Sequence, residues 1–572
     1  MDSFKLLKRR TTELFNSLPH ALPSLGSPGA NRMKGTWEKI QVPPLPRSSH
    51  STNIVAGTVY IFGGEINPRE PVDNDMHVVT LPSSGAPADY YAIKAKPAKS
   101  SAPTKKPAIP TIGEGEPTPD VAAEEEEITE TGEEGAHGRH LSDVSLTTPS
   151  PGPGMDKGKG ISSASNPGLP DVPAPRVGHA TAVIGHRIFL FGGRGGPDMA
   201  ALDEGGRVWV FDTRTHLWSF LDPAPPASGA AISVPPPRSY HSAVATPKPD
   251  TFNKAPAHHQ HRHSTSRGRA DSWRDWALGG PDADDLGTPQ RPIVGVLAER
   301  ATDADSDGYG TLIIHGGCLS GAGERASDVW AFDVRSRVWQ RLPDAPGSPR
   351  GAAALALSRS RLYRFGGFNG TNQEGGQLDF LELGVDSFDD EFSAGEVVLC
   401  ARGQWQSLMQ GREDVGYKEV DEAEKPLDGG HPEEWPGNRS VAGFEAVTVG
   451  GGREYLVLMF GEREASGAGH AAAGKFWDDV WVFQVPAQGM SPASVADTVF
   501  SVVGRKSGEG KWTKVQTEPY DDEDDASIDG PGARGWVATA TMGELEENGI
   551  VVWGGLAEGN QRLGDGWIFR LG

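Results

Sequence analysis

The sequence predicts an all-β protein in which a four-stranded unit is repeated six times around a ring. Three observations lead to this fold class. A pattern of arginine, apolar strand and paired glycine recurs six times along the 572 residues. The chain combines 75 glycines and 46 prolines with 15 tryptophans, which suits short strands joined by tight turns around large aromatic side chains. A strand-like segment near the N-terminus supplies the strand that the last repeat lacks.

Each repeat begins with an arginine, and its second strand usually ends in an aromatic residue and two glycines. The six arginines are Arg47, Arg176, Arg238, Arg350, Arg439 and Arg534. The strand ends that follow them are Phe62-Gly63-Gly64, Phe191-Gly192-Gly193, His315-Gly316-Gly317, Phe365-Gly366-Gly367, Phe460-Gly461 and Trp553-Gly554-Gly555. In the first, second and fourth repeats, the first glycine follows the arginine by sixteen residues. Such self-similarity is typical of repeat architectures.

The third and fourth strands of the repeats carry aromatic residues that can fill the space between twisted sheets. We expect third strands at 75–79, 208–212, 329–333, 378–381, 477–483 and 566–569, and fourth strands near Trp218, Trp339, Trp405 and Trp512. The sixth repeat has no fourth strand, but Gly35 to Val42, which contains Trp37, has the required pattern. We therefore predict a six-bladed β-propeller whose last blade is completed by the N-terminal strand, because closure removes exposed sheet edges.

Three segments do not fit the repeat, and we predict that they are long disordered insertions. They are an acidic, Pro/Ser-rich insertion at 97–172, a His/Arg-rich insertion at 246–291 and a charged loop at 411–436. Such compositions bury too little apolar surface to offset the entropy lost on ordering. The acidic patch could bind a basic partner and the histidines could bind divalent ions, but solvated tracts are favoured. Residues 1–34 are expected to form a flexible N-terminal tail and residues 35–572 the propeller.

Composition excludes several classes of function. The net charge of −23 argues against nucleic-acid binding, which requires basic residues that displace phosphate counterions. Cys318 and Cys400 are too few for a disulfide framework and suit a reducing compartment. No apolar run approaches the length of a membrane span, and the first residues lack the apolar core of a secretory signal. We expect a cytoplasmic protein without membrane contact, and a nuclear location stays open.

The arginines at the blade starts permit two interpretations. A closed ring would place the six guanidinium groups at one height, where they could bind anions. Alternatively, each arginine could bond a neighbouring carboxylate or main-chain carbonyl and so act as a structural strut. We favour the strut.

The repeat as a whole resembles that of kelch propellers. A second and closer resemblance lies in the loop that begins at Gly461-Glu462 and carries Glu462, Ser466 and His470 at four-residue spacing. Together with Pro46 to His50, Phe191 to Arg194, Phe365 to Gly370 and Arg534-Gly535-Trp536, this loop resembles the specifier proteins. These are the nitrile-, epithionitrile- and thiocyanate-forming kelch proteins of the plant glucosinolate pathway.

The resemblance implies a site and a reaction. The specifier family binds Fe(II) through a Glu-x3-Asp-x3-His motif, in which Glu462 and His470 match two positions. Ser466 occupies the aspartate position, and its neutral hydroxyl is a poor substitute for a carboxylate on Fe(II). Arg194 matches an arginine that holds the substrate's sulfate, and Arg325 is a second candidate for that contact. The family rearranges an unstable thiohydroximate-O-sulfate.

A galactose-oxidase-type copper site is a further alternative, because that enzyme also contains a kelch-like propeller. Cys318 follows Gly316-Gly317, but the sequence offers no tyrosine and histidine ligand set around it. We interpret Cys318 as a small turn or core residue.

The residues favour a protein-binding or scaffold module over an enzyme. Its partners would contact the propeller loops and the disordered insertions, and a small anionic ligand is also compatible. The alternative is a specifier-like, Fe(II)-dependent lyase acting on a sulfated thiohydroximate-like substrate with an altered metal triad. No catalytic residue is assigned, and Fe(II) is implied by the resemblance alone.

Overall fold

The computed structural model describes the propeller part of the chain. It describes residues 33–82, 86–98, 169–226, 229, 231–247, 310–319, 323–387, 397–410, 435–469, 472–486, 510–520 and 530–572. All of them belong to one unit, which comprises residues 1–98 and 169–572. Most of the predicted tail and of the three predicted insertions lies outside the described residues, so their disorder stays a prediction. None of the described helices has the length and apolar character needed to cross a membrane.

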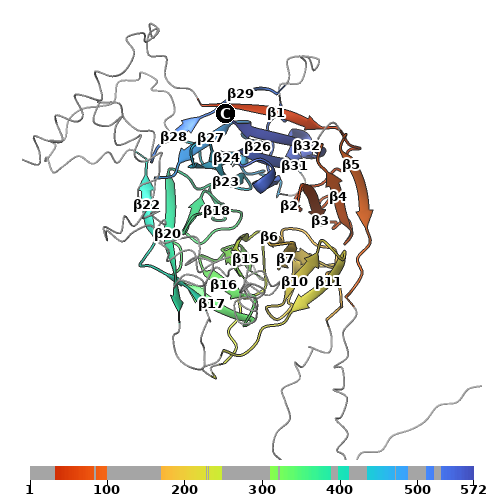
Figure 1. Cartoon of the computed structure of the whole chain (residues 1–572), viewed down its shortest axis with the longest axis vertical. Coiled ribbons are helices and arrows are strands. Elements are labelled where there is room, and N and C mark those ends of the chain that lie inside the picture. The colour runs from red at the N-terminus through yellow and green to blue at the C-terminus, as the bar shows by residue number, and fades with distance from the viewer. Residues whose placement is uncertain are drawn as a thin grey trace, which may run out of the picture. The chain divides into compact units, whose positions relative to one another are not determined.

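Six sheets follow one another around a ring (Figure 1). Blade 1 contains β2 (Ser51–Val55), β3 (Thr58–Phe62), β4 (Met76–Thr80) and β5 (Asp89–Ile93). Blade 2 contains β6 (Ala180–Ile184), β7 (Arg187–Phe191), β10 (Val208–Asp212) and β11 (Leu217–Leu221). Blade 3 contains β13 (Ser242–Thr246), β14 (Thr311–His315), β16 (Val329–Asp333) and β17 (Val338–Leu342). The all-β, six-bladed prediction is confirmed in these blades and in the three that follow.

Of the remaining blades, blades 4 and 6 carry an additional strand and blade 5 has four strands. Blade 4 contains β18 (Ala354–Ser358), β19 (Arg361–Phe365) and the long β20 (Gln377–Ser387), with which both β21 (Val397–Ala401) and β22 (Gln406–Met409) pair. Blade 5 contains β23 (Gly443–Val449), β24 (Arg453–Met459), β27 (Val480–Gln484) and β28 (Trp512–Lys514). Blade 6 contains β30 (Ala538–Thr541), β31 (Gly549–Ala557), β32 (Gln561–Leu571), β1 (Lys34–Ile40) and β29 (Gln516–Pro519).

Short elements complete the loops. The two-stranded pairs are β8 (Arg194–Gly195) with β9 (Ala200–Ala201), β12 (Arg238–Ser239) with β15 (Cys318–Leu319), and β25 (Glu462–Glu464) with β26 (Lys475–Phe476). The described 3-10 helices are η3 (Gly543–Leu545) and η4 (Glu558–Asn560).

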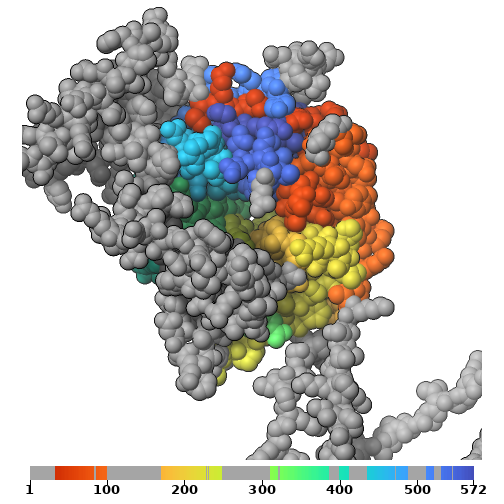
Figure 2. Space-filling model, in the orientation of Figure 1, coloured from red at the N-terminus to blue at the C-terminus, as the bar shows by residue number. Residues whose placement is uncertain are grey.

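The ring closes through the N-terminal strand, as predicted. β1 pairs antiparallel with β32, and Trp37 stands opposite Phe569. Figure 2 shows the red N-terminal residues lying beside the blue C-terminal ones at this seam. One addition was not predicted: β29 pairs with β1 in parallel and covers the outer edge of the blade.

The sequence pattern missed two outer strands because they lack its tryptophan marker. β5 carries Tyr90 and Tyr91 instead, and β21 has no aromatic residue. The ends of the predicted insertions also belong to the propeller: Pro97 bridges to Trp218 in blade 2, and Trp435 packs near Trp512.

Among the described residues the core consists of six apolar clusters, and each cluster joins two neighbouring blades. Large aromatic side chains are prominent in four of these clusters, where they pack between the blades as predicted. The cluster that joins blades 3 and 4 has no buried aromatic residue and consists of aliphatic side chains. The largest fully buried aromatic side chains are Trp209, Trp218, Trp481 and Trp553.

The six blade-start arginines are struts. Each is at most 5% exposed and donates from Nη1 to a main-chain carbonyl at the end of its blade's second strand, at 2.8–3.2 Å. Five of them also form ion pairs, with Glu204, Asp328, Glu374, Asp479 and Asp565, and Arg47 contacts His77 instead. These guanidinium groups are therefore occupied and do not form an anion site.

The paired glycines allow neighbouring blades to approach closely. The N–H of the second glycine donates to the carbonyl of the next blade's arginine, as from Gly64 to Arg176 at 3.0 Å. Gly63 has a φ of +64°, and a Cβ there would lie 2.6 Å from the Arg176 carbonyl oxygen. At Gly63, both the backbone conformation and the lack of space therefore disfavour a side chain. Blade 5 has Phe460 at the first of these positions, with a φ of +59°.

Candidate functional site at the propeller mouth

A closed ring of backbone hydrogen bonds forms the propeller mouth. Its members stand two residues after each blade arginine: Ser49, Gly178, Tyr240, Ala352, Val441 and Trp536. The N–H of each residue donates to the carbonyl of the equivalent residue in the preceding blade, at 2.6–3.2 Å. All six have φ between +48° and +60°, which is strained for a β-branched residue such as Val441. Such strain persists only where the surrounding structure enforces it. We call these residues the mouth ring.

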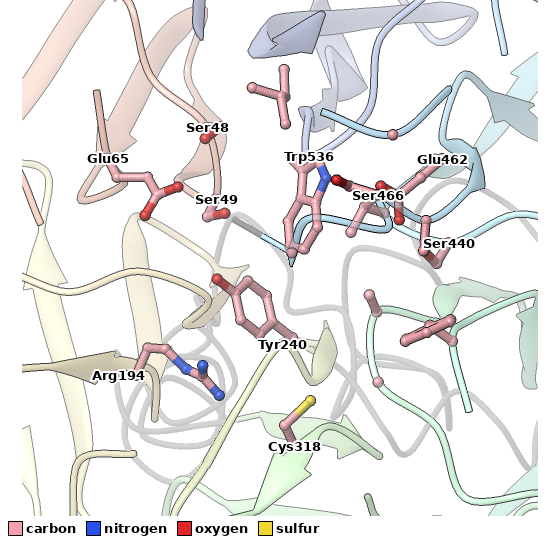
Figure 3. Close-up of a pocket in the computed structure, with 18 of the residues that line it drawn as sticks. Ser48, Ser49, Glu65, Arg194, Tyr240, Cys318, Ser440, Glu462, Ser466 and Trp536 are labelled. Carbon is pink, nitrogen blue, oxygen red and sulfur yellow. The ribbon is translucent and has the colours of Figure 1, made fainter. Parts of the chain in front are cut away.

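A cavity of about 440 Å³ lies at the mouth ring and is lined by residues from all six blades. We call it the mouth cavity. Figure 3 shows Arg194, Tyr240 and Trp536 around a common opening, with Glu462 on the far side from Arg194. Its volume is within the range of small-ligand pockets.

Two arginines line the cavity without a carboxylate partner among the described residues. Arg194, in β8, donates from Nε to the Ser239 hydroxyl at 2.9 Å and lies over the Tyr240 ring at 5.1 Å. Arg325 donates to the Gly323 carbonyl at 2.8 Å and lies over the Phe368 ring at 5.1 Å. Both are partly exposed. Stacked and unpaired guanidinium groups can accept a carboxylate, sulfate or phosphate with little rearrangement.

Glu462 and Ser466 line the same cavity, so the structure brings these two predicted residues together with the two arginines. Glu462 lies in β25, is 7% exposed and accepts a hydrogen bond from Gln373 at 3.0 Å. Burial raises the pKa of Glu462 to about 7, although the bond from Gln373 opposes the rise. Ser466 is partly buried and accepts a bond from the N–H of Ala468. His470 lies outside the described residues.

The described donors do not fit an Fe(II) site. Glu462 supplies one carboxylate, and burial raises its pKa to about 7, so it ionises less readily than an ordinary carboxyl, whereas a metal ligand must be ionised. Ser466 is neutral, and Glu464, in the same loop, is exposed and paired with Lys475 at 2.6 Å. In the part of the chain that the structure describes, no three His, Cys, Asp or Glu side chains could jointly hold a metal ion. The triad that includes His470 stays a prediction.

Other residues of the cavity escaped the sequence analysis. Arg562 of blade 6 pairs with Glu65 of blade 1 at 2.8 Å, with both side chains nearly buried. Tyr240 and Trp536 contact each other edge to face at 5.3 Å. Their position two residues after the blade arginine was a signal that could have found them. Cys318, expected as a turn or core residue, lies in β15, is partly exposed and lines the cavity.

The fold, the repeats and the struts define a six-bladed β-propeller, and residues 175–225 match the Kelch motif family. The chain is similar to N-(sulfonatooxy)prop-2-enimidothioate sulfolyase of Thlaspi arvense, with 23% identity over 411 residues. That alignment covers 70% of this chain and 94% of the relative. The predicted resemblance to kelch-type specifier proteins is therefore confirmed.

Other similar proteins carry different names. Kelch domain-containing protein 3 of Bos taurus is 26% identical over 257 residues, which cover 36% of this chain and 64% of that protein. Among solved structures, YjhT aligns over 92% of this chain and 95% of that chain, with 10% identity and a TM-score of 0.42.

Proposed function

We propose that this protein is a binding module that holds an acidic segment of a partner protein at the propeller mouth. The supporting observation is the contrast between two sets of arginines. The six blade arginines are buried and engaged, whereas Arg194 and Arg325 face the cavity without a carboxylate partner among the described residues. A carboxylate of a bound peptide would provide that partner.

The charge balance of the cavity supports this choice. Three of the described arginines line it, and the third, Arg562, is paired with Glu65. The raised pKa of Glu462 leaves that carboxyl partly protonated near neutral pH. The mouth is therefore a positive region on a chain whose net charge is −23. Such a local field favours anionic segments.

Aromatic side chains provide the apolar part of the contact. Tyr240, Phe368 and Trp536 line the cavity, and rigid aromatic and arginine side chains dominate the binding energy of many interfaces. An acidic residue flanked by apolar residues would therefore match this surface better than a uniformly charged stretch.

The test measures the affinity of the purified full chain for labelled peptides that contain aspartate or glutamate beside leucine, and for their amide counterparts. We expect acidic peptides to bind and amide peptides to bind at least about tenfold more weakly. The double substitution Arg194→Met and Arg325→Met should abolish this preference. Arg341→Met, which removes an exposed arginine paired with Asp344, is the control. Equal affinity for both kinds of peptide would overturn the proposal.

A second candidate function is lysis of a small organic sulfate, which the similarity over 94% of a sulfolyase supports. In this function Arg194 and Arg325 would hold the sulfate group of the substrate. Release of a sulfate group is the reaction that the relative's name, sulfolyase, describes. The test incubates the chain, with anaerobic Fe(II), with a thiohydroximate-O-sulfate and detects nitrile or thiocyanate products. Bound iron is measured in the wild type, in His470→Ala and in Ser466→Asp. No product, together with iron binding that His470→Ala leaves unchanged, would exclude this candidate.

A further inference from the structure

A second cavity, of about 310 Å³, lies within the propeller and is lined by the inner strands of all six blades. We call it the channel cavity. It lies further along these strands than the mouth ring: Thr539 is three residues beyond Trp536, and Glu445 is four residues beyond Val441. No lysine, arginine or histidine is among the described residues that line it.

Polar groups occupy the sector formed by blades 5, 6, 1 and 2. The Thr539 hydroxyl of blade 6 donates to Glu445 of blade 5 at 2.7 Å. In the same way, Asn53 of blade 1 donates to Thr181 of blade 2 at 2.9 Å. Both bonds follow one rule. The first partner stands four positions after the mouth-ring residue of its blade. The second partner stands three positions after the mouth-ring residue of the next blade.

The same pairing rule explains an unpaired hydroxyl. Thr52 of blade 1 is equivalent to Thr539 and Thr181, and its partner position in blade 6 is occupied by Ala540. The Thr52 side chain is 6% exposed, and its hydroxyl has no hydrogen-bond partner among the described residues. A hydroxyl left unpaired in this way gains free energy from a ligand that can donate or accept a hydrogen bond.

The opposite sector, formed by blades 2, 3 and 4, is apolar. Its equivalent positions carry Ala182, Ala243, Val244, Leu355 and Ala356. The channel cavity thus has a polar side with one carboxyl and an opposite side whose side chains are apolar.

Glu445 is the only acidic residue that lines the cavity, and Thr539 is its only hydrogen-bond partner in the described part of the chain. Burial raises the pKa of Glu445 to about 7, and the bond from Thr539 only partly offsets this effect. Glu445 is partly exposed to this cavity, and no described cation lines the cavity beside it, so its carboxylate lacks the counter-charge that favours an ionised group withdrawn from bulk water.

We infer that the channel cavity binds a primary alkylammonium group, with the ammonium on Glu445 and Thr539 and the alkyl chain against the alanines of blades 2 to 4. A lone carboxylate is a poor match for Ca²⁺ or Mg²⁺, which take several oxygen ligands in defined geometry. The cavity is also large for a bare ion, whereas its apolar side suits an aliphatic chain. The alkylammonium comes from a free small amine or from a lysine side chain of a peptide. This site is independent of the function proposed for the mouth.

The experiment is calorimetric titration of the full chain with n-butylammonium and with n-butanol, which has a similar alkyl chain and no charge. We expect binding of the amine and none of the alcohol. Glu445→Gln, which preserves shape and the bond to Thr539, should weaken amine binding at least about tenfold. Glu518→Gln, which removes an exposed carboxyl on β29, should leave it unchanged. Thr539→Val carries the test if Glu445→Gln does not fold, as judged by its thermal unfolding.

Two results would overturn the inference: butanol and butylammonium binding alike, or amine binding that neither channel variant weakens. Displacement of the amine by K⁺ at comparable concentration would also overturn it, because the site would then be an ion site. A titration with an acetylated, amidated lysine tripeptide distinguishes the sources. Tighter binding of the tripeptide assigns the lysine side chain, and tighter binding of butylammonium assigns the free amine. The sulfate and peptide tests of the mouth do not depend on any of these outcomes.

Discussion

Replacing Asp328 with alanine is expected to destabilise the propeller strongly, because this carboxylate neutralises a fully buried arginine. Both carboxylate oxygens of Asp328 accept bonds from Arg238, at 2.7 and 2.8 Å, and one also accepts from the Trp330 ring N–H at 2.7 Å. The Arg238 side chain has no exposed surface. Without Asp328, Arg238 retains bonds to the carbonyls of Pro236 and Gly316 but loses its counter-charge.

The magnitude follows from two independent estimates. Breaking a buried ion pair by removing one partner costs about 3–5 kcal/mol. Losing two charge-assisted hydrogen bonds, at about 1.5–3 kcal/mol each, leads to about the same range. We therefore expect the free energy of unfolding to fall by about 3–5 kcal/mol, which is a large part of the stability of an ordinary domain.

The assay is urea denaturation followed by both circular dichroism and tryptophan fluorescence. Asp344→Ala is the matched control, because Asp344 pairs with Arg341 at 2.7 Å while both side chains are about half exposed. The control should cost at most about 1 kcal/mol, because water screens such pairs. If the two variants lose the same stability, the strut interpretation of the blade arginines is wrong.

At acidic pH, the difference in the free energy of unfolding between the wild type and Asp328→Ala should become smaller. Burial alone would raise the pKa of Asp328, but the bonds and charge of Arg238 outweigh it and hold the pKa below its ordinary value. The native state thus binds fewer protons than the unfolded state, so stability rises with pH in this range. The contribution is complete above the ordinary carboxyl pKa and is lost as pH falls through the lowered one.

Three further predictions concern the mouth, the glycine pairs and the seam. Because burial raises the pKa of Glu462 to about 7, the affinity for acidic peptides should fall as pH rises through neutrality and Glu462 becomes charged. Fluorescence anisotropy measures this affinity, and Glu462→Gln should remove its dependence on pH. If the pH dependence persists in Glu462→Gln, another group causes it. Gly366→Ala should lower the free energy of unfolding in urea by about 2 kcal/mol or more beyond the effect of Gly185→Ala. Both glycines have positive φ, but only at Gly366 would the added Cβ meet a main-chain oxygen, that of Arg439. Trp37→Ala should lower the free energy of unfolding by about 3–5 kcal/mol, as measured by thermal denaturation. The Trp37 side chain is 6% exposed within the cluster that joins blades 5 and 6. If the variant is as stable as the wild type, the N-terminal strand does not hold the propeller closed.

The local sequence pattern was sufficient to predict the fold, because each repeat contains its strands, turns and packing residues in consecutive positions. The spacing from Arg47 to Gly63 and from Arg176 to Gly192 identified the blades. The strand around Trp37 identified the closure, since a ring with a missing strand has one place for it. Outer strands such as β5 and β21 escaped because they lie at sheet edges, where packing does not demand a tryptophan.

The sites depended on pairs of residues from different parts of the chain, and only the tertiary structure decided those. Sequence alone named Arg194, Arg325, Glu462 and Ser466, and the structure places all four on one cavity. The sequence could not show which arginines lack a carboxylate partner, because such partners are distant along the chain: Asp328, the partner of Arg238, stands 90 residues away. The carboxyl of Glu445 was likewise unremarkable in sequence, since its surroundings come from six separate strands. Repetition determines a blade locally, whereas charge balance in a cavity is a property of the closed ring.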